Sequence, residues 1–138
     1  MQRHLGNCQV CEKEGRASAY SLEGVTTIMQ VSEFLDSPLR NAWLHFAYLD
    51  AYVRRGYHLI DSKTVCCFDI ANVSVVPRHR RKGVFKSWLA EIEVVAASRG
   101  LAGVFVESIQ NEVLVPFLTS QGYSPVPGSL PPSMFKRV

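Results

Sequence analysis

Residues 73–89 have the sequence VSVVPRHRRKGVFKSWL, which joins an apolar run, a basic turn and an amphipathic segment. The valines before Pro77 alternate with other residues as in a half-buried strand, and proline ends the strand because it cannot donate to a sheet ladder. After Gly83 the apolar residues recur at spacings of three and four, which predicts a helix that ends near Gly100. The start of such a helix presents free backbone N–H groups and the positive end of the helix dipole. The stretch therefore predicts a binding site for phosphate.

This turn resembles motif A of the GNAT superfamily of acyl-CoA-dependent N-acyltransferases, in which it holds the pyrophosphate of the coenzyme. The matching residues are Val75-x-Pro77-x-x-Arg80-x-x-Gly83-Val84. Two positions depart from the motif: Phe85 replaces a small residue, and Arg81 stands where glycine is frequent. The resemblance places Phe85 inside the helix, where its larger side chain can turn into the core.

A second match follows along the chain. Residues 103–109, GVFVESI, form a short apolar run suited to a buried strand. The residues after it resemble GNAT motif B, which has a strand, an asparagine, a short helix and a glycine-aromatic pair; the matches are Asn111, Leu114, Phe117, Gly122 and Tyr123. The stretch from Val106 to Leu118 also resembles small, often phage-encoded members. The resemblance covers about residues 65–138 and leaves the first half unmatched.

The resemblance implies an α/β (α+β) fold: one GNAT-like domain over residues 1–138, with a mixed central β-sheet flanked by helices. Acetyl-CoA would lie where the strand before Pro77 parts from the strand at 103–109. Backbone N–H groups of residues 81–85 would hold the pyrophosphate, and residues 74–76 would pair with the pantetheine arm. The expected coenzyme contacts are Ser74, Val75, Val76, Arg78, Arg80, Arg81, Lys82, Gly83, Val84, Phe85, Asn111 and Phe117.

The implied activity is transfer of an acetyl group from acetyl-CoA to a primary amine of a small molecule or protein, by direct attack in a ternary complex. Glu107 is the candidate base, because it lies near the strand end that faces the acceptor. The family often has a tyrosine acid in the helix after the asparagine, but Leu118 stands there. Bound water or the hydroxyl of Tyr123 is then expected to protonate the thiolate. The alternative is a weakly active or inactive module that binds a partner protein.

Composition limits the other classes of function. The 138 residues are 47% hydrophobic and 20% charged, as in a soluble globular domain. The net charge of +3 is concentrated in the turn, which suits a phosphate-rich cofactor better than nucleic acid, since no second basic stripe or aromatic platform accompanies it. No apolar run has the length of a membrane span, so we expect a cytoplasmic protein without membrane contact, and a homodimer is left open.

The cysteines do not predict a metal site. Cys8 and Cys11 form a CxxC pair, but the other two cysteines, Cys66 and Cys67, are adjacent and cannot complete a zinc site. We therefore expect no bound metal and free thiols.

The unmatched half gives further expectations. Residues 25–35 are ambiguous between strand and helix. Residues 38–55 predict a helix with Ser37 as N-cap and Gly56 as stop, which packs on the sheet. Its aromatic side chains fit either an acceptor pocket or the core: Trp43, Phe46, Tyr48 and Tyr52.

The segments on either side of Asp61 predict a hairpin. Residues 57–60 and 65–76 have the character of antiparallel strands. The second strand is long, so a bulge is expected between Asp69 and Asn72, as the GNAT resemblance also implies. Residues 134–138 are expected to return as a last edge strand.

Overall fold

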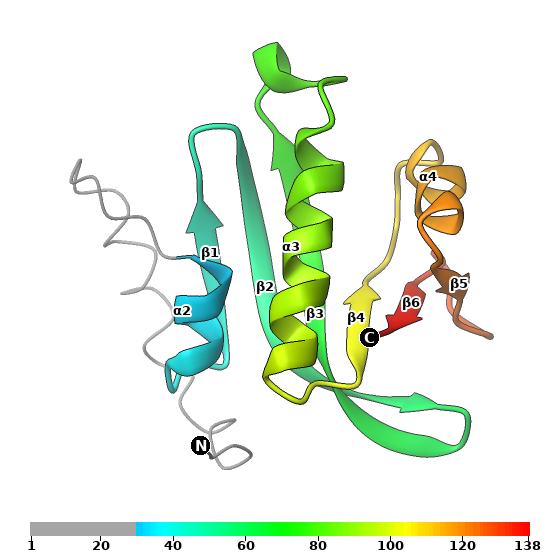
Figure 1. The fold of residues 1–138 in the computed structure, drawn as a ribbon. Coiled ribbons are helices and arrows are strands. Elements are labelled where there is room, and N and C mark those ends of the chain that lie inside the picture. Colours follow the sequence, from blue (N-terminus) through cyan, green and yellow to red (C-terminus); the bar gives the residue numbers. More distant parts are fainter. Residues whose placement is uncertain (1–29) are drawn as a thin grey trace.

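The computed structural model describes residues 30–138 and has a six-stranded sheet in the order β1-β2-β3-β4-β6-β5 (Figure 1). β3 and β4 are parallel, and the other neighbouring strands are antiparallel. The strands are β1 (Asn41–His45), β2 (Leu49–Ile60), β3 (Lys63–Val75), β4 (Gly103–Val106), β5 (Ser124–Pro125) and β6 (Met134–Arg137). The helices are α2 (Val31–Asp36), α3 (Val84–Ser98) and α4 (Leu114–Ser120), with a 3-10 turn, η2, at Pro77–His79. The predicted mixed sheet with flanking helices is confirmed.

The two faces of the sheet differ, because successive side chains of a strand point to opposite sides. One face packs with α2, α3 and α4 in the main core, where Phe68 and Ile70 of β3 meet Trp88 and Ile92 of α3. Figure 1 shows α2 and α3 on the same side of the sheet. The other side is called the second face below, and it holds a small apolar cluster of Ile60, Cys67 and Phe105.

The helix predicted over residues 38–55 is wrong, because this segment forms β1 and the first half of β2. The backbone N–H of Phe46 donates to the carbonyl of Leu49 (2.8 Å) and closes the turn between the strands. Residues two apart are buried on the core side: Ala42, Leu44, Leu49, Ala51 and Val53. The apolar residues of this segment fit both the helical spacing of three and four and the strand spacing of two. The segment forms strands because it can then pair with β3 and cover the core.

The aromatic residues of this segment divide between the two faces. Phe46 and Tyr48 pack against the main core. Trp43 and Tyr52 lie opposite each other in the β1–β2 register, with ring centroids 5.2 Å apart, on the second face. The core interpretation therefore holds for the first pair and not for the second.

Arg55 ties α2 to the sheet. Its side chain is only 6% exposed, and its guanidinium donates to the carbonyl oxygens of Leu39 (2.7 Å), Ser37 (3.1 Å) and Phe34 (3.2 Å), and also to that of Leu35. Carbonyls at the end of a helix lack partners within it, so a buried cation satisfies them. This is a structural role for Arg55.

The predicted hairpin is confirmed, with longer strands than expected. β2 and β3 pair along their whole lengths, and Asp61 and Ser62 form the turn with φ of 52° and 69°. Two residues in the left-handed region form the turn whose twist matches a two-residue hairpin.

The predicted bulge in β3 is also confirmed. Val53 pairs with Ile70, whereas the preceding Tyr52 pairs with Asn72, so Ala71 is an extra residue without a partner on β2. An extra residue of this kind bends the strand and increases its twist.

The C-terminal strand departs from expectation. β6 lies between β4 and β5, so the edge of the sheet on this side is the two-residue β5 and the prediction of a last edge strand is wrong. Within the ambiguous residues 25–35, those from Val31 onward are helical, and residues 25–29 lie outside the described part.

Of the cysteines, the structure describes Cys66 and Cys67. Cys67 is buried and Cys66 is half-buried, and burial raises the pKa of the Cys67 thiol to about 12, so it stays protonated. Cys8 and Cys11 lie outside the described residues, so the expectation of no zinc there stays a prediction. Among residues 30–138, no helix has both the length and the apolar character needed to cross a membrane.

Candidate functional site

The basic turn between β3 and α3 has the geometry that its sequence predicts. β3 ends at Val75, η2 follows, and Gly83 precedes α3 with φ of 76°, a left-handed conformation that favours glycine. Among the described residues, no side chain caps the N-terminus of α3, and its first turn has no acidic residue. The first N–H groups of the helix therefore have no intrahelical acceptor and can bind an anion.

The cations of the turn surround this helix end. Arg78, Arg81 and Lys82 are exposed. Arg80 folds back, because its Nε donates to the carbonyl of Val75 (3.0 Å). The turn thus offers positive charge at the helix N-terminus and at the end of β3, where a phosphate-rich ligand would gain from both.

The parallel strands separate beside this turn. β3 and β4 pair from Cys67 to Ile70, and the last bond joins the N–H of Glu107 to the carbonyl of Ile70 (3.0 Å). β3 then continues to Val75, while the chain after β4 turns away towards α4 (Figure 1). Along residues 72–75, β3 therefore has a strand partner on the β2 side alone within the described chain. Backbone groups on the other edge can pair with an extended ligand.

Asn111, Phe85 and Phe117 lie on the α4 side of this parting. Asn111 is exposed and its Oδ1 accepts from the N–H of Val113 (3.0 Å), which shapes the turn into α4. Phe117 and Phe85 have ring centroids 5.7 Å apart and both pack at the edge of the main core. Phe85 therefore turns inward, in agreement with the sequence.

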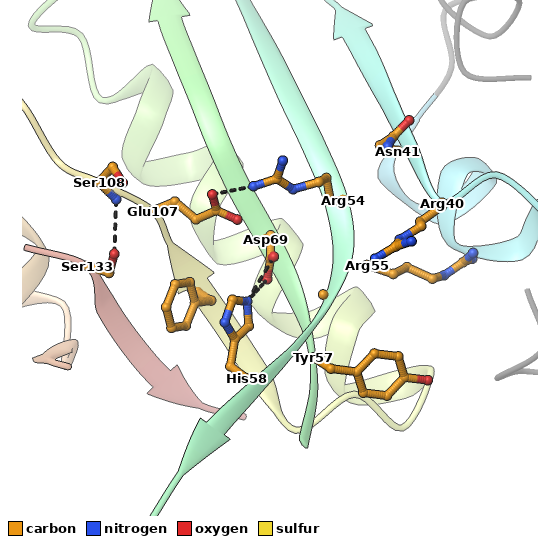
Figure 2. Close-up of a pocket in the computed structure, with 12 residues that line it drawn as sticks. Arg40, Asn41, Arg54, Arg55, Tyr57, His58, Asp69, Glu107, Ser108 and Ser133 are labelled. Carbon is orange, nitrogen blue, oxygen red and sulfur yellow. Dashed lines mark hydrogen bonds and ion pairs between the residues drawn. The ribbon is translucent and has the colours of Figure 1, made fainter. Parts of the chain in front are cut away.

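A cluster of charged side chains lies on the second face, at the point where β3 and β4 begin to separate (Figure 2). Arg54 of β2 forms an ion pair with Glu107. His58 of β2 has its Nε2 2.9 Å from each carboxylate oxygen of Asp69 on β3. The chain after Glu107 is fixed by a bond from the Ser108 N–H to the Ser133 Oγ (3.0 Å). Four charged or ionisable side chains, from β2, from β3 and from the residue that follows β4, thus meet at one place.

Asp69 is the unusual member of this cluster because its side chain is only 2% exposed. Burial raises the pKa of the Asp69 carboxyl to about 6, against the opposing effect of His58 and with a further rise from Glu107. A Cβ on Gly56 would overlap the Asp69 carboxylate, so a larger residue at this position would force the buried carboxyl to move. His58 is held by stacking on Phe105, with ring centroids 3.6 Å apart. The surroundings therefore make room for a buried carboxyl and fix its partner.

The donor atoms of His58, Asp69 and Glu107 lie within 4.8 Å of one another, which is close enough for a shared cation. However, Arg54 already pairs with Glu107, and His58 with Asp69. Glu107 is therefore paired with Arg54 and the Asp69 carboxyl with His58, and a divalent ion would have to displace one of these protein groups.

A pocket opens over the cluster. It has a volume of about 480 Å³ and extends from Glu107, Ser108 and Ser133 across β2 to Arg40 and Asn41 at the start of β1 (Figure 2). Such a volume suits a small ligand. The site lies on the second face, beside the place where β3 and β4 part.

Tyr123 and Leu118 lie elsewhere, in the main core. Tyr123 is 2% exposed, and its hydroxyl donates to the Glu93 carboxylate (2.8 Å), which also accepts from Lys136 (3.0 Å). Burial, together with Glu93, strongly raises the pKa of Tyr123. Its proton is held by an internal partner, which argues against a role as acid. Leu118 is fully buried.

The sequence missed Asp69, His58 and Arg54 as site residues. The signal that could have found them is the alternation of Arg54, Gly56 and His58, which places all three on one face of a strand. The prediction of a helix over residues 38–55 concealed it.

Comparison with solved structures finds a similar fold in several proteins, among them the acetyltransferases Naa20 and AtaT. Chaetomium thermophilum Naa20 in complex with a bisubstrate analogue matches with a TM-score of 0.54 and 15% identity, over 99% of this chain and 85% of that chain. An AtaT toxin mutant bound to the C-terminus of the antitoxin AtaR and acetyl-CoA matches with a TM-score of 0.53 and 16% identity. The KacTA–DNA complex matches with a TM-score of 0.55 and 14% identity.

The last two matches are partial. Each covers 65% of this chain and 58% of the other chain, so the described protein spans less than two thirds of the length of its AtaT and KacTA counterparts. No protein-family model and no curated protein matches the sequence. The structural matches confirm the GNAT-like fold that the two sequence motifs predict.

Proposed function

We propose that this protein is an N-acetyltransferase that transfers an acetyl group from acetyl-CoA to a primary amine of a small molecule or protein, by direct attack in a ternary complex. The observation that carries the proposal is the position of the anion-binding turn before α3. It lies next to the parting of β3 and β4, and buried Asp69 with Glu107 lies at the foot of the same parting. The presence of acetyl-CoA in the structure of the AtaT toxin mutant, which shares this fold, supports the same donor.

The coenzyme would be held mainly by backbone groups. The N–H groups of residues 81–85 would bind the pyrophosphate, and Arg78, Arg80 and Lys82 would add charge. Along residues 74–76, the edge of β3 that lacks a strand partner would pair with the pantetheine arm and polarise the thioester carbonyl. The Val75 carbonyl accepts from Arg80, and this bond would give way where the ligand pairs with that carbonyl. Arg81 would add charge, and Val84, Phe85, Asn111 and Phe117 would border the arm on the helix side.

Bound acetyl-CoA would supply an electrophilic thioester carbonyl for the acceptor amine to attack. The protein must then take up the proton of the amine, and the carboxylates of Asp69 and Glu107 are placed to do so. Because the pKa of Asp69 is about 6, this carboxyl is mostly ionised near neutral pH and still basic enough to accept a proton. Arg54 holds Glu107 in position through their ion pair. Bound water would protonate the leaving thiolate.

A second candidate is a non-catalytic module that keeps the coenzyme cleft and acts by binding a partner protein. The buried positions of Leu118 and Tyr123 favour it, because Leu118 has no proton to give and the hydroxyl proton of Tyr123 is held by Glu93. Asp69 favours the enzyme, because a buried carboxyl is costly to keep in a domain that only binds a partner.

The test is coenzyme binding by two matched glycine variants. Gly83→Glu should abolish most CoA binding in calorimetry, since it adds negative charge and bulk at the phosphate turn. Gly100→Glu is the control: Gly100 has a similar φ of 78°, lies at the other end of α3 and has open space around it, so the backbone strain is matched. Equal CoA affinity in the wild type and Gly83→Glu would contradict the coenzyme site.

Thiol release with a panel of amines separates the two candidate functions. The enzyme should release CoA with at least one acceptor. CoA binding without release for any small-molecule or protein amine would favour the binding module.

A further inference from the structure

The pocket on the second face carries charges of both signs, at opposite ends. Asp69 and Glu107 lie at the end near the parting of β3 and β4, and Arg40 lies at the end near β1 (Figure 2). The acceptor must enter with its amine towards the carboxylates if the proposed function holds. Arg40 then faces the other end of the acceptor.

Arg40 differs from the two arginines beside it. Arg54 forms an ion pair with Glu107, and Arg55 is buried and donates to the carbonyls at and after the end of α2. For the Arg40 side chain, by contrast, residues 30–138 provide neither a hydrogen-bond acceptor nor an ion-pair partner. The guanidinium of Arg40 is therefore the cation of this pocket that is left for a ligand.

Asn41 adds an unsatisfied group at the same end. Its Oδ1 is buried and accepts no hydrogen bond from the described part of the chain, and Asn41 lines the pocket. A buried acceptor without a donor is costly, so a ligand N–H group, such as that of a peptide bond, removes a cost here, whereas a carboxylate brings no donor and is bound by Arg40 alone.

We propose that the acceptor is a small amine that also carries a carboxylate, several bonds away from the amine. This inference rests on the proposed function, because it places the amine at Asp69 and Glu107. The carboxylate binds Arg40, whose planar guanidinium matches a carboxylate with two parallel hydrogen bonds. A plain amine leaves Arg40 unpaired and gains nothing at this end.

The strand spacing sets the separation of the two groups in the acceptor. β1 and β3 flank β2, so they lie about 10 Å apart across the sheet. The side chain of Arg40 covers part of this distance. An α-amino acid, whose amine and carboxylate are neighbours, is therefore too short, whereas an ω-amino acid or a short peptide fits the pocket of about 480 Å³.

The test compares 6-aminohexanoate with 6-aminohexanamide, which have the same length and differ in the charge at one end. Thiol release from acetyl-CoA gives kcat/KM for each. The wild type should prefer the carboxylate by about tenfold, the scale of one hydrogen-bonded charge. Arg40→Gln should remove this preference and keep the rate for the amide. Lys63→Gln, at an exposed cation on the hairpin, should keep the preference and serves as control.

Two results would overturn the inference: equal kcat/KM for both amines in the wild type, or an equal loss for both in Arg40→Gln. If no amine gives thiol release, the proposed function fails separately, and calorimetry then decides on the pocket. Binding of 6-aminohexanoate that weakens about tenfold in Arg40→Gln supports the ligand class. Binding that is absent, or unchanged by the substitution, refutes it.

Discussion

Replacing Asp69 with asparagine should make the protein more stable and less active at the same time. Asparagine has the same shape and stays neutral, so it avoids the cost of a buried charge. The pKa of Asp69 is about 6 in the folded protein and 3.8 in its ordinary state, a difference that corresponds to about 3 kcal/mol. At pH 7 the free energy of unfolding should therefore rise by up to about 3 kcal/mol in Asp69→Asn, while turnover falls about a hundredfold through loss of the base.

The gain in stability from Asp69→Asn should depend on pH, because the pKa of Asp69 is raised in the folded state. The folded state binds the proton of Asp69 more tightly than the unfolded state, so the stabilising contribution is fully present below pH 3.8 and is lost as the pH rises through about 6. The difference between Asp69→Asn and the wild type should thus be largest at pH 7 and should shrink towards pH 4. Urea unfolding at several pH values measures it.

Asp61→Asn is the matched control for this experiment. Asp61 is exposed in the hairpin turn, 3.3 Å from Arg137, so its neutral variant should change stability little at any pH. An Asp69→Asn variant that is less stable than the wild type at pH 7 would refute the argument, because it would mean that the carboxylate stabilises the fold through His58.

Three other substitutions test separate parts of the structure. Glu107→Gln should keep acetyl-CoA binding and lower turnover about a hundredfold if Glu107 shares the proton transfer. Glu112→Gln, at an exposed carboxylate, should keep the wild-type rate and serves as control. A wild-type rate in Glu107→Gln across pH 6 to 9 would show that Glu107 takes no part in the reaction. Gly56→Ala should destabilise the protein by about 1–3 kcal/mol in urea unfolding, because its Cβ meets the Asp69 carboxylate, and the loss should be smaller in an Asp69→Ala background. Cys8→Ser with Cys11→Ser should leave stability nearly unchanged, and metal analysis of the wild type should find no stoichiometric zinc; one zinc per chain that disappears in the double variant would contradict this.

The elements that could be predicted from sequence are those whose signals are local. Proline at the end of β3, glycine before α3 and the helical spacing after it specify strand, turn and helix within one short stretch. The hairpin around Asp61 and the bulge in β3 are likewise encoded close to where they occur.

Segment 38–55 could not be predicted correctly because its apolar residues fit two periods. The turn around Phe46 contains neither glycine nor proline, so nothing local separates β1 from β2. The choice depends on pairing with β3, which is a contact between distant residues.

The charged cluster could not be predicted for the same reason, since it depends on contacts between residues far apart in the sequence. Asp69 meets His58 and Arg54 only through the register of two strands, and Tyr123 matches its motif by spacing although its hydroxyl is buried against Glu93. The spacing of a motif does not show which partner a side chain meets in the fold, so neither the pairing of Asp69 with His58 nor that of Tyr123 with Glu93 could be predicted from it.

The bulge at Ala71 absorbs one extra residue of β3 without changing the faces on which the residues before and after it lie. Ile70 and Val73 both pack on the main core although they are three positions apart, which a regular strand does not allow. Deleting Ala71 would place Asn72 directly after Ile70, which restores strict alternation and keeps Val73 and Val75 on the core side and Asp69 on the second face. Only the local bend and the extra twist of the bulge would be lost. The extra residue therefore sets the bend of β3 just before it separates from β4, and not the faces on which its side chains lie.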